Sequence, residues 1–99
     1  MGSNPTSGTA SLVLSRSEMD RTLADVADAS DGRLLEIAEV TGTGADSRRL
    51  REIGFCSGAP VRFIRRAPLG DPAMYELRGA LLSLRRSEAR RIRVHRAGA

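Results

Sequence analysis

The sequence predicts a mainly β protein: a small, strongly bent barrel of five short strands with one short inserted α-helix. Five segments with the alternating or clustered apolar residues typical of strands follow one another after residue 32. Tight turns rich in Gly and Pro separate them. A chain of 99 residues is too short for two open, flat sheets to bury enough apolar surface. The expected strands are residues 33–41, 61–67, 73–78, 81–85 and 92–96.

The organised part of the chain is expected to begin at Thr22, which is placed to cap a single helical turn. Leu23 and Val26 would pack on the core beneath that turn. Residues 1–21 are rich in Ser, Gly and Thr and lack the basic start and long apolar stretch of a secretory signal. We expect residues 1–21 to be a disordered leader or the remnant of a tag, and residues 22–96 to form one domain.

The first strand, residues 33–41, shows an imperfect alternation. Leu35 and Ile37 would share one face of the strand. Leu34 and Val40 interrupt the pattern, so the strand is expected either to carry a bulge or to be covered on both sides.

The inserted helix is expected over residues 46–53. Leu50 and Ile53 lie three positions apart, which places both on the face that would pack against the core. Gly54 suits the left-handed conformation that ends many helices, and Phe55 can fold back on the last turn.

The later connections are short. Residues 68–72 form a rigid link with two prolines and one glycine, and Gly79-Ala80 is expected to make a tight hairpin turn. Ser87 is placed to cap one helical turn over residues 88–91. With the helix, the strands offer a modest core: Leu35, Ile37, Val61, Phe63, Tyr75, Leu77, Leu82, Leu84, Ile92, Val94, Leu50, Ile53 and Phe55. We expect the barrel to be closed.

The charge is unevenly distributed along the chain. All 16 basic residues are arginine. Residues 1–47 hold three Arg against eight acidic residues, a net charge of −5, and residues 48–99 hold 13 Arg against four, a net charge of +9. A basic half suits a nucleic acid, an acidic partner or a membrane surface. Aromatic residues make up 3%, too few for the stacking platforms that bind single strands, and no apolar run approaches the roughly 20 residues of a membrane span.

Catalytic and metal-binding motifs are missing from the sequence. The only histidine, His95, lies in the last expected strand, nearly at the end of the sequence, so we expect no Ser/His/Asp set. No glycines form a GxxxxGK[ST] phosphate-binding loop and Lys is absent, so we expect no enzyme, although an arginine supplied to a partner's G domain stays open. Cys56 and His95, with oxygen donors Asp71, Glu76 or Glu88, could hold a divalent metal, including across a dimer. No CxxC or HxxxH spacing supports this. We expect Cys56 to be an inert thiol that is at least half buried, in a protein from a reducing compartment. We expect His95 to be solvated.

Several sequence runs resemble the ferrous iron transport protein A (FeoA) family. The resemblance covers roughly residues 22–95 and rests on RRLREIGF at 48–55, RRAPLGDP at 65–72, LRG at 77–79 and LSLRR at 82–86. It implies a stand-alone SH3-like barrel and a non-enzymatic cytoplasmic accessory of bacterial ferrous iron uptake. It also implies a partner, the cytosolic G-protein domain of the membrane transporter, ferrous iron transport protein B.

The surface expected to meet that partner comes from two elements. Exposed arginines on the inserted helix form one patch, and the apolar tip of the connection between the second and third strands, flanked by arginines, forms the other. The residues are Arg48, Arg49, Arg51, Arg65, Arg66 and Leu69. The alternative is that Leu69 packs on the barrel and the arginines only confer solubility. From other classes, a nucleic-acid-binding module and a metal-responsive regulatory module stay open, and exposed strand edges would allow self-association.

Overall fold

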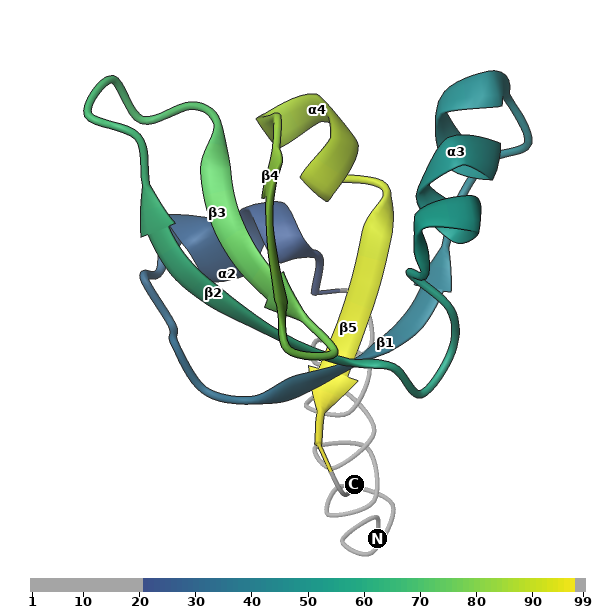
Figure 1. Ribbon diagram of the computed structural model, residues 1–99, viewed down its shortest axis with the longest axis horizontal. Helices are drawn as coiled ribbons and strands as arrows, with labels where there is room; N and C mark the ends of the chain where they lie inside the picture. Colours follow the sequence, from purple (N-terminus) through teal and green to yellow (C-terminus); the bar gives the residue numbers. More distant parts are fainter. Residues whose placement is uncertain (1–20, 98–99) are drawn as a thin grey trace, which may run out of the picture.

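The computed structural model describes residues 21–97, so most of the expected leader, residues 1–20, lies outside the described part. These residues form one five-stranded antiparallel sheet that bends strongly around a core (Figure 1). The strands are β1 (Leu35–Val40), β2 (Pro60–Arg66), β3 (Ala73–Leu77), β4 (Ala80–Leu84) and β5 (Ile92–Arg96). Their spatial order is β4-β3-β2-β1-β5. The mainly β, five-stranded prediction is confirmed, with every strand within two residues of its expected bounds.

Three short helices accompany the sheet: α2 (Leu23–Asp28), α3 (Ala45–Ile53) and α4 (Arg86–Ala89). Helix α3 is the predicted insertion between β1 and β2, and Figure 1 shows it standing beside the barrel. Helix α2 packs against β2, β5 and α4. Thr22 caps α2 as predicted: its hydroxyl accepts from the Asp25 N–H at 3.4 Å, and the Asp25 carboxylate accepts from the Thr22 N–H at 3.0 Å.

Helix α4 begins earlier than predicted, so the assignment of Ser87 as its cap is wrong. The N-cap is Arg85, whose backbone N–H donates to Glu88 Oε1 at 2.9 Å. A glutamate three residues after the cap satisfies the free backbone donor. Ser87 therefore lies inside the helix.

The core contains nearly all the predicted residues, and Ile53 is the clear exception. Its side chain is 44% exposed, whereas Leu50 and Phe55 are fully buried. Helix α3 contacts the barrel through only two buried residues, Ser47 and Leu50. Gly54, with φ of 129°, then turns the chain, and Phe55 occupies the core in place of Ile53. Leu82 is only partly buried.

Two strands change register partway along. Strand β1 has an irregularity between Ile37 and Glu39 in its pairing with β5, which favours the bulge among the two alternatives expected for this strand. Strand β2 has an irregularity between Phe63 and Arg65 in its pairing with β3. The β3–β4 hairpin turns at Arg78-Gly79, one residue before the predicted Gly79-Ala80. Both turn residues have positive φ, 52° and 89°, as a two-residue hairpin loop requires.

The two ends of the sheet differ in how their outer edges are satisfied. Along β5, the Val94 N–H donates to the Arg21 carbonyl at 2.9 Å, and Thr22 bridges Arg93. Strand β4 pairs with β3 alone among the described strands. The expected closed barrel is thus wrong in one respect, because no hydrogen-bonded ladder joins β4 to β5 within residues 21–97.

Candidate functional site

The connection between β2 and β3, called here the 67–72 connection, holds Leu69 out in solvent. The side chain of Leu69 is 96% exposed. The Ala67 N–H donates to the Pro72 carbonyl at 2.9 Å, and the Gly70 N–H donates to the Ala67 carbonyl at 2.8 Å. These bonds fix the backbone on both sides of the tip. The alternative in which Leu69 packs on the barrel is therefore wrong.

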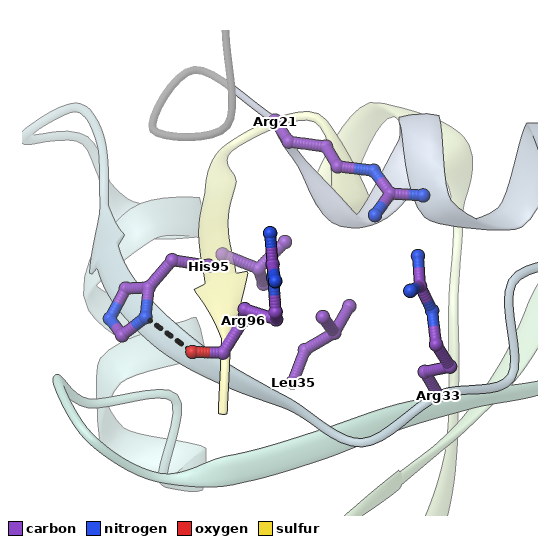
Figure 2. A pocket seen from close by; sticks show the side chains of 6 residues that line it. Arg21, Arg33, Leu35, His95 and Arg96 are labelled. Carbon is purple, nitrogen blue, oxygen red and sulfur yellow. Dashed lines mark hydrogen bonds between the residues drawn. The ribbon is translucent and has the colours of Figure 1, made fainter. Parts of the chain in front are cut away.

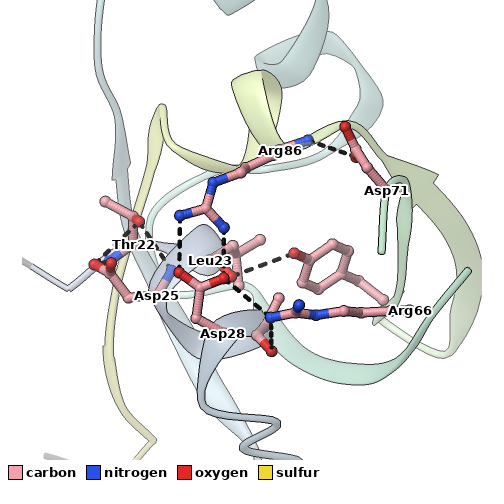
Figure 3. Close-up of polar contacts among 9 residues, drawn as sticks. Thr22, Leu23, Asp25, Asp28, Arg66, Asp71 and Arg86 are labelled. Atoms are coloured by element: carbon pink, nitrogen blue, oxygen red, sulfur yellow. Dashed lines mark hydrogen bonds and ion pairs between the residues drawn. The ribbon is translucent and has the colours of Figure 1, made fainter. Parts of the chain in front are cut away.

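A network of charged side chains anchors this connection to the body of the barrel (Figure 3). The Arg86 backbone N–H donates to Asp71 Oδ1 at 2.9 Å. The Arg86 guanidinium binds both oxygens of Asp28, which also accepts from Arg66 at 3.0 Å. Hydrogen bonding from Arg86, followed by the charges of Arg86 and Arg66, holds the pKa of Asp28 below its usual value. Arg66 additionally donates to the Ala27 carbonyl at 2.7 Å, so its guanidinium faces inward.

Tyr75 lies under the network and joins β3 to α2. Its hydroxyl donates to the Leu23 carbonyl at 3.2 Å. Burial raises the pKa of Tyr75 to about 12. The ring of Tyr75 also meets Phe63 edge to face, with 6.0 Å between centroids.

The three arginines of α3 have three different roles. Arg51 Nη2 donates to the carbonyls of Val40 and Gly42 at 2.6 and 2.7 Å, which holds α3 against the end of β1. Arg49 pairs with Glu88 at 2.8 Å. Arg48 is exposed, and its side chain has no partner within residues 21–97. Only Arg48 is left fully available for a partner.

Helix α4 connects the two predicted patches, which do not contact each other directly. Figure 1 shows α4 between the 67–72 connection and α3 at one end of the barrel. Arg86 of α4 holds Asp71, and Glu88 of α4 holds Arg49. Sequence reasoning assigned no such role to α4, because the partners are 15 and 39 residues apart and no local pattern links them.

A shallow hollow of about 220 Å³ lies beside the connection. Pro68 and Pro72 form one side of it, and Met74 and Ser83 of the outer sheet face form another. Arg65 lines the hollow and is exposed, with no side-chain partner in the described part of the chain. Apolar, rigid walls next to an available cation are typical of a protein-binding surface.

A second, smaller pocket of about 80 Å³ is lined by arginines near the end of β5 (Figure 2). Asp31 accepts from Arg21 at 2.9 Å and from Arg33 at 3.0 Å. Hydrogen bonds from Arg33 hold the pKa of Asp31 far below its usual range. Because one carboxylate already pairs with both guanidinium groups, we assign this pocket no ligand.

The candidate metal ligands are not assembled. Cys56 is exposed, contrary to the expected burial, and Arg78 Nη2 donates to its sulfur at 3.1 Å. Nδ1 of His95 lies 3.1 Å from the Arg96 carbonyl oxygen and 4.0 Å from Glu36 Oε1. Within residues 21–97, no three His, Cys, Asp or Glu side chains are grouped to hold a metal ion. Each expected oxygen donor contacts an arginine instead: Asp71, Glu76 and Glu88.

None of the helices between residues 21 and 97 combines the length and apolar character needed to cross a bilayer.

Known proteins are similar to this chain in sequence and in fold. A Porphyromonas gingivalis protein described as an Fe(2+) transport protein A/Fe(2+) transporter FeoB fusion is 38% identical over 58 residues. The match covers 59% of this chain but only 7% of that relative's length. The FeoA protein of Chlorobium tepidum superposes with a TM-score of 0.66 at 38% identity, over 80% of this chain and 73% of that one.

A third similar structure supports the fold class. Zinc-complexed FeoA of Stenotrophomonas maltophilia is described as a procaryotic SH3 domain protein suggested to act as a ferrous iron transport activating factor. It is 29% identical, with a TM-score of 0.59 over 75% of this chain and 88% of that one. The SH3-like prediction is thus confirmed. The family model for the FeoA domain matches residues 22–96, and the chain therefore belongs to the FeoA domain family, which is associated with ferrous iron transport.

Proposed function

We propose that this protein is a non-enzymatic accessory and regulator of ferrous iron uptake in the cytoplasm. Its partner is the cytosolic G-protein domain of the membrane iron transporter. Membership of the FeoA family supports the link to iron uptake. The Porphyromonas gingivalis relative supports the choice of partner, because there the transport protein A part and the FeoB transporter form one polypeptide.

The exposure of Leu69 is the observation that carries the docking surface. A leucine that is 96% exposed, at the tip of a hydrogen-bonded connection, gains contact area only when another molecule covers it. The connection is tied to the barrel through Asp71 and Arg86, so little conformational entropy is lost on docking. Leu69 is therefore the expected hot spot.

Charge completes the surface. Arg65 lines the hollow beside the 67–72 connection and Arg48 lies on α3, and both side chains are exposed. Such cations at the rim of an interface mainly speed association with an acidic surface and set its salt dependence. The partner surface is therefore expected to hold an apolar recess bordered by carboxylates.

Calorimetric titration of the full chain with the purified G domain of its own transporter tests the proposal. Leu69→Ser should weaken binding at least tenfold, or about 1.4 kcal/mol, because the central apolar contact is lost. Leu34→Ser is the matched control, since Leu34 is a half-exposed leucine outside this surface. Arg48→Glu and Arg65→Glu should each weaken binding less than Leu69→Ser does. The effect of these two charge reversals should be larger at low salt, where charges are screened less.

Two results would contradict the proposal. One is that the wild-type chain gives no heat of binding at concentrations well above roughly 100 μM, the weak end of the affinity range for transient complexes. The other is equal affinity of the wild-type and Leu69→Ser proteins. Equal weakening of binding by Leu34→Ser and Leu69→Ser would contradict the assignment of the docking surface to Leu69.

A nucleic-acid-binding module is the alternative from another class, and we favour it less. Phosphate contacts need available arginines. Three arginines of the sheet instead pair with carboxylates: Arg62 with Glu76, Arg66 with Asp28 and Arg93 with Glu39. A metal-responsive regulatory role is favoured less as well, because the described residues assemble no ligand group.

A further inference from the structure

Strand β4 presents an unpaired backbone edge. Its hairpin with β3 closes on the pair Leu77 and Ala80 across a two-residue turn. In such a hairpin the closing pair is hydrogen-bonded, and pairs then alternate along the ladder. Leu81 and Ser83, opposite Glu76 and Met74, are thus in the non-bonded positions. Their N–H and C=O groups point away from β3.

Nothing within residues 21–97 covers this edge. Leu81 and Ser83 are exposed, and their outward backbone groups have no backbone partner among the described residues. The strand sequence ALLSL contains no charge, proline or bulge. Proteins usually protect an open edge with one of those features, so an unprotected edge favours the addition of another strand.

The charges at the two ends of β4 argue against a second copy of this chain. The outer edge of β5 is occupied by Arg21 and Thr22, so β4 of one copy has no β5 edge to join. Two β4 strands paired antiparallel about Leu82 would bring Arg78 of each copy opposite Arg86 of the other and next to its Arg85. Like charges facing one another across strands are destabilising.

The same charges indicate what the edge can accept. Arg78 precedes β4 and Arg85 follows it, and both are exposed. Arg78 donates to the sulfur of Cys56 and pairs with no carboxylate within residues 21–97, so its charge is not compensated there. The hollow beside the 67–72 connection is lined by both Arg65 and Ser83, which makes the edge continuous with the proposed docking surface.

We propose that β4 accepts an extended segment of a protein partner as a sixth strand. The segment has an uncharged, β-branched or apolar centre of about five residues and acidic residues at both ends. Backbone hydrogen bonds at Leu81 and Ser83 give affinity, and Arg78 and Arg85 select the acidic ends. This inference deepens the proposed function and rests on it, since the segment would belong to the transporter's G domain.

A synthetic peptide tests the inference on the full chain. The probe is a nine-residue peptide, Glu-Glu-Val-Thr-Val-Thr-Val-Glu-Glu, and the control has Lys in place of each Glu. At saturation, amide hydrogen exchange at Leu81 and Ser83 should slow at least tenfold, because those N–H groups gain acceptors. The Lys-ended peptide should bind at least tenfold more weakly. Unchanged exchange at both amides, or equal affinity for the two peptides, would overturn the inference.

Two variants separate backbone pairing from side-chain contact. Ser83→Pro removes one outward N–H and should weaken the probe at least tenfold, provided circular dichroism shows the native fold. Leu81→Ser keeps every backbone group and should stay within threefold of wild type. A loss with Leu81→Ser that matches or exceeds the loss with Ser83→Pro would overturn strand addition, and the exchange measurement stands even where Ser83→Pro fails to fold.

The G domain itself distinguishes the two proposals. One outcome is that the G domain binds in a way that depends on Leu69 and leaves amide exchange at Leu81 and Ser83 unchanged. That result would support the proposed function and contradict the addition of a sixth strand. If the domain does not bind the full chain, the proposed function falls together with the assignment of the segment to that domain.

Discussion

Helix α3 and the 67–72 connection stand on either side of α4 at one end of the barrel (Figure 1). Their side chains are used in opposite ways. Helix α3 uses Leu50 and Arg51 to hold itself to the barrel. The connection is held by its backbone and by Asp71, which leaves Leu69 in solvent. An exposed residue on a helix can thus be structural, while an apolar residue on a loop can be free to bind.

The largest effect is expected where α3 enters the core. Leu50→Ala should lower the free energy of unfolding by about 2–5 kcal/mol, because a fully buried leucine leaves a cavity. Leu69→Ala is the matched control and should change it by less than about 0.5 kcal/mol. Urea denaturation monitored by circular dichroism measures both. Similar losses in the free energy of unfolding for both variants would mean that Leu69 packs on the barrel in solution. They would contradict the contrast between α3 and the 67–72 connection.

Arg51 should matter more for stability than its exposure suggests. Arg51→Ala removes a charged donor from the Val40 and Gly42 carbonyls and should cost about 1–3 kcal/mol. Arg48→Ala, one turn away and without such bonds, should stay within about 0.5 kcal/mol of wild type. Thermal unfolding of the two variants compares them. A larger cost for Arg48→Ala would reverse the roles assigned within α3.

Acid should act on the anchor of the connection through Asp28. The folded-state pKa of Asp28 is lowered by Arg86, so its contribution to stability is present above the unfolded-state value, about 3.9, and is lost as pH falls through the lower folded-state value. Asp28→Asn should therefore reduce the fall in thermal midpoint as the pH drops from about 5 through the unfolded-state value and then through the lower folded-state value. The carbonyls that hold Arg51 do not titrate. An unchanged acid slope in Asp28→Asn would contradict the anchor.

The smallest effect is expected at the surface pair between α3 and α4. Arg49→Ala removes a contact with Glu88 in which the arginine side chain is 63% exposed. Such pairs contribute about 0.2–1 kcal/mol and are screened by salt. The difference from wild type in urea denaturation should shrink at 1 M NaCl, on the scale where the Debye length is about 3 Å. A difference that persists in salt would indicate packing by the arginine stem.

Much of the fold could be predicted because strands and helices have fixed side-chain periods. Alternation located all five strands, and the spacing around Leu50 with Gly54 located α3. The errors fall where a period ends: Ile53 lies at the last turn of α3, and the β3–β4 turn moved by one residue to Arg78. Turn positions depend on φ, which sequence patterns constrain weakly outside glycine.

The site was less predictable because its geometry depends on distant pairs. Leu69 was named as a candidate, but loop position alone left its burial open. The sequence pattern predicts that the Arg66 and Arg51 side chains face solvent. Both instead bind backbone carbonyls that are distant in the sequence, those of Ala27 and Val40. The pairing of Asp28 with Arg86 spans 58 residues, so only the assembled fold reveals it.

The short stretch formed by Arg21 and Thr22 decides how many sides of the barrel can recruit a strand. While these two residues cover the edge of β5, β4 is the only described strand with an exposed edge. A barrel with one exposed edge can add one further strand and no more. Removal of residues through Thr22 would leave two complementary open sides. Head-to-tail contacts of that kind propagate without closing. A shortened version of the domain should therefore retain Arg21. Without it, the domains should assemble into open-ended oligomers.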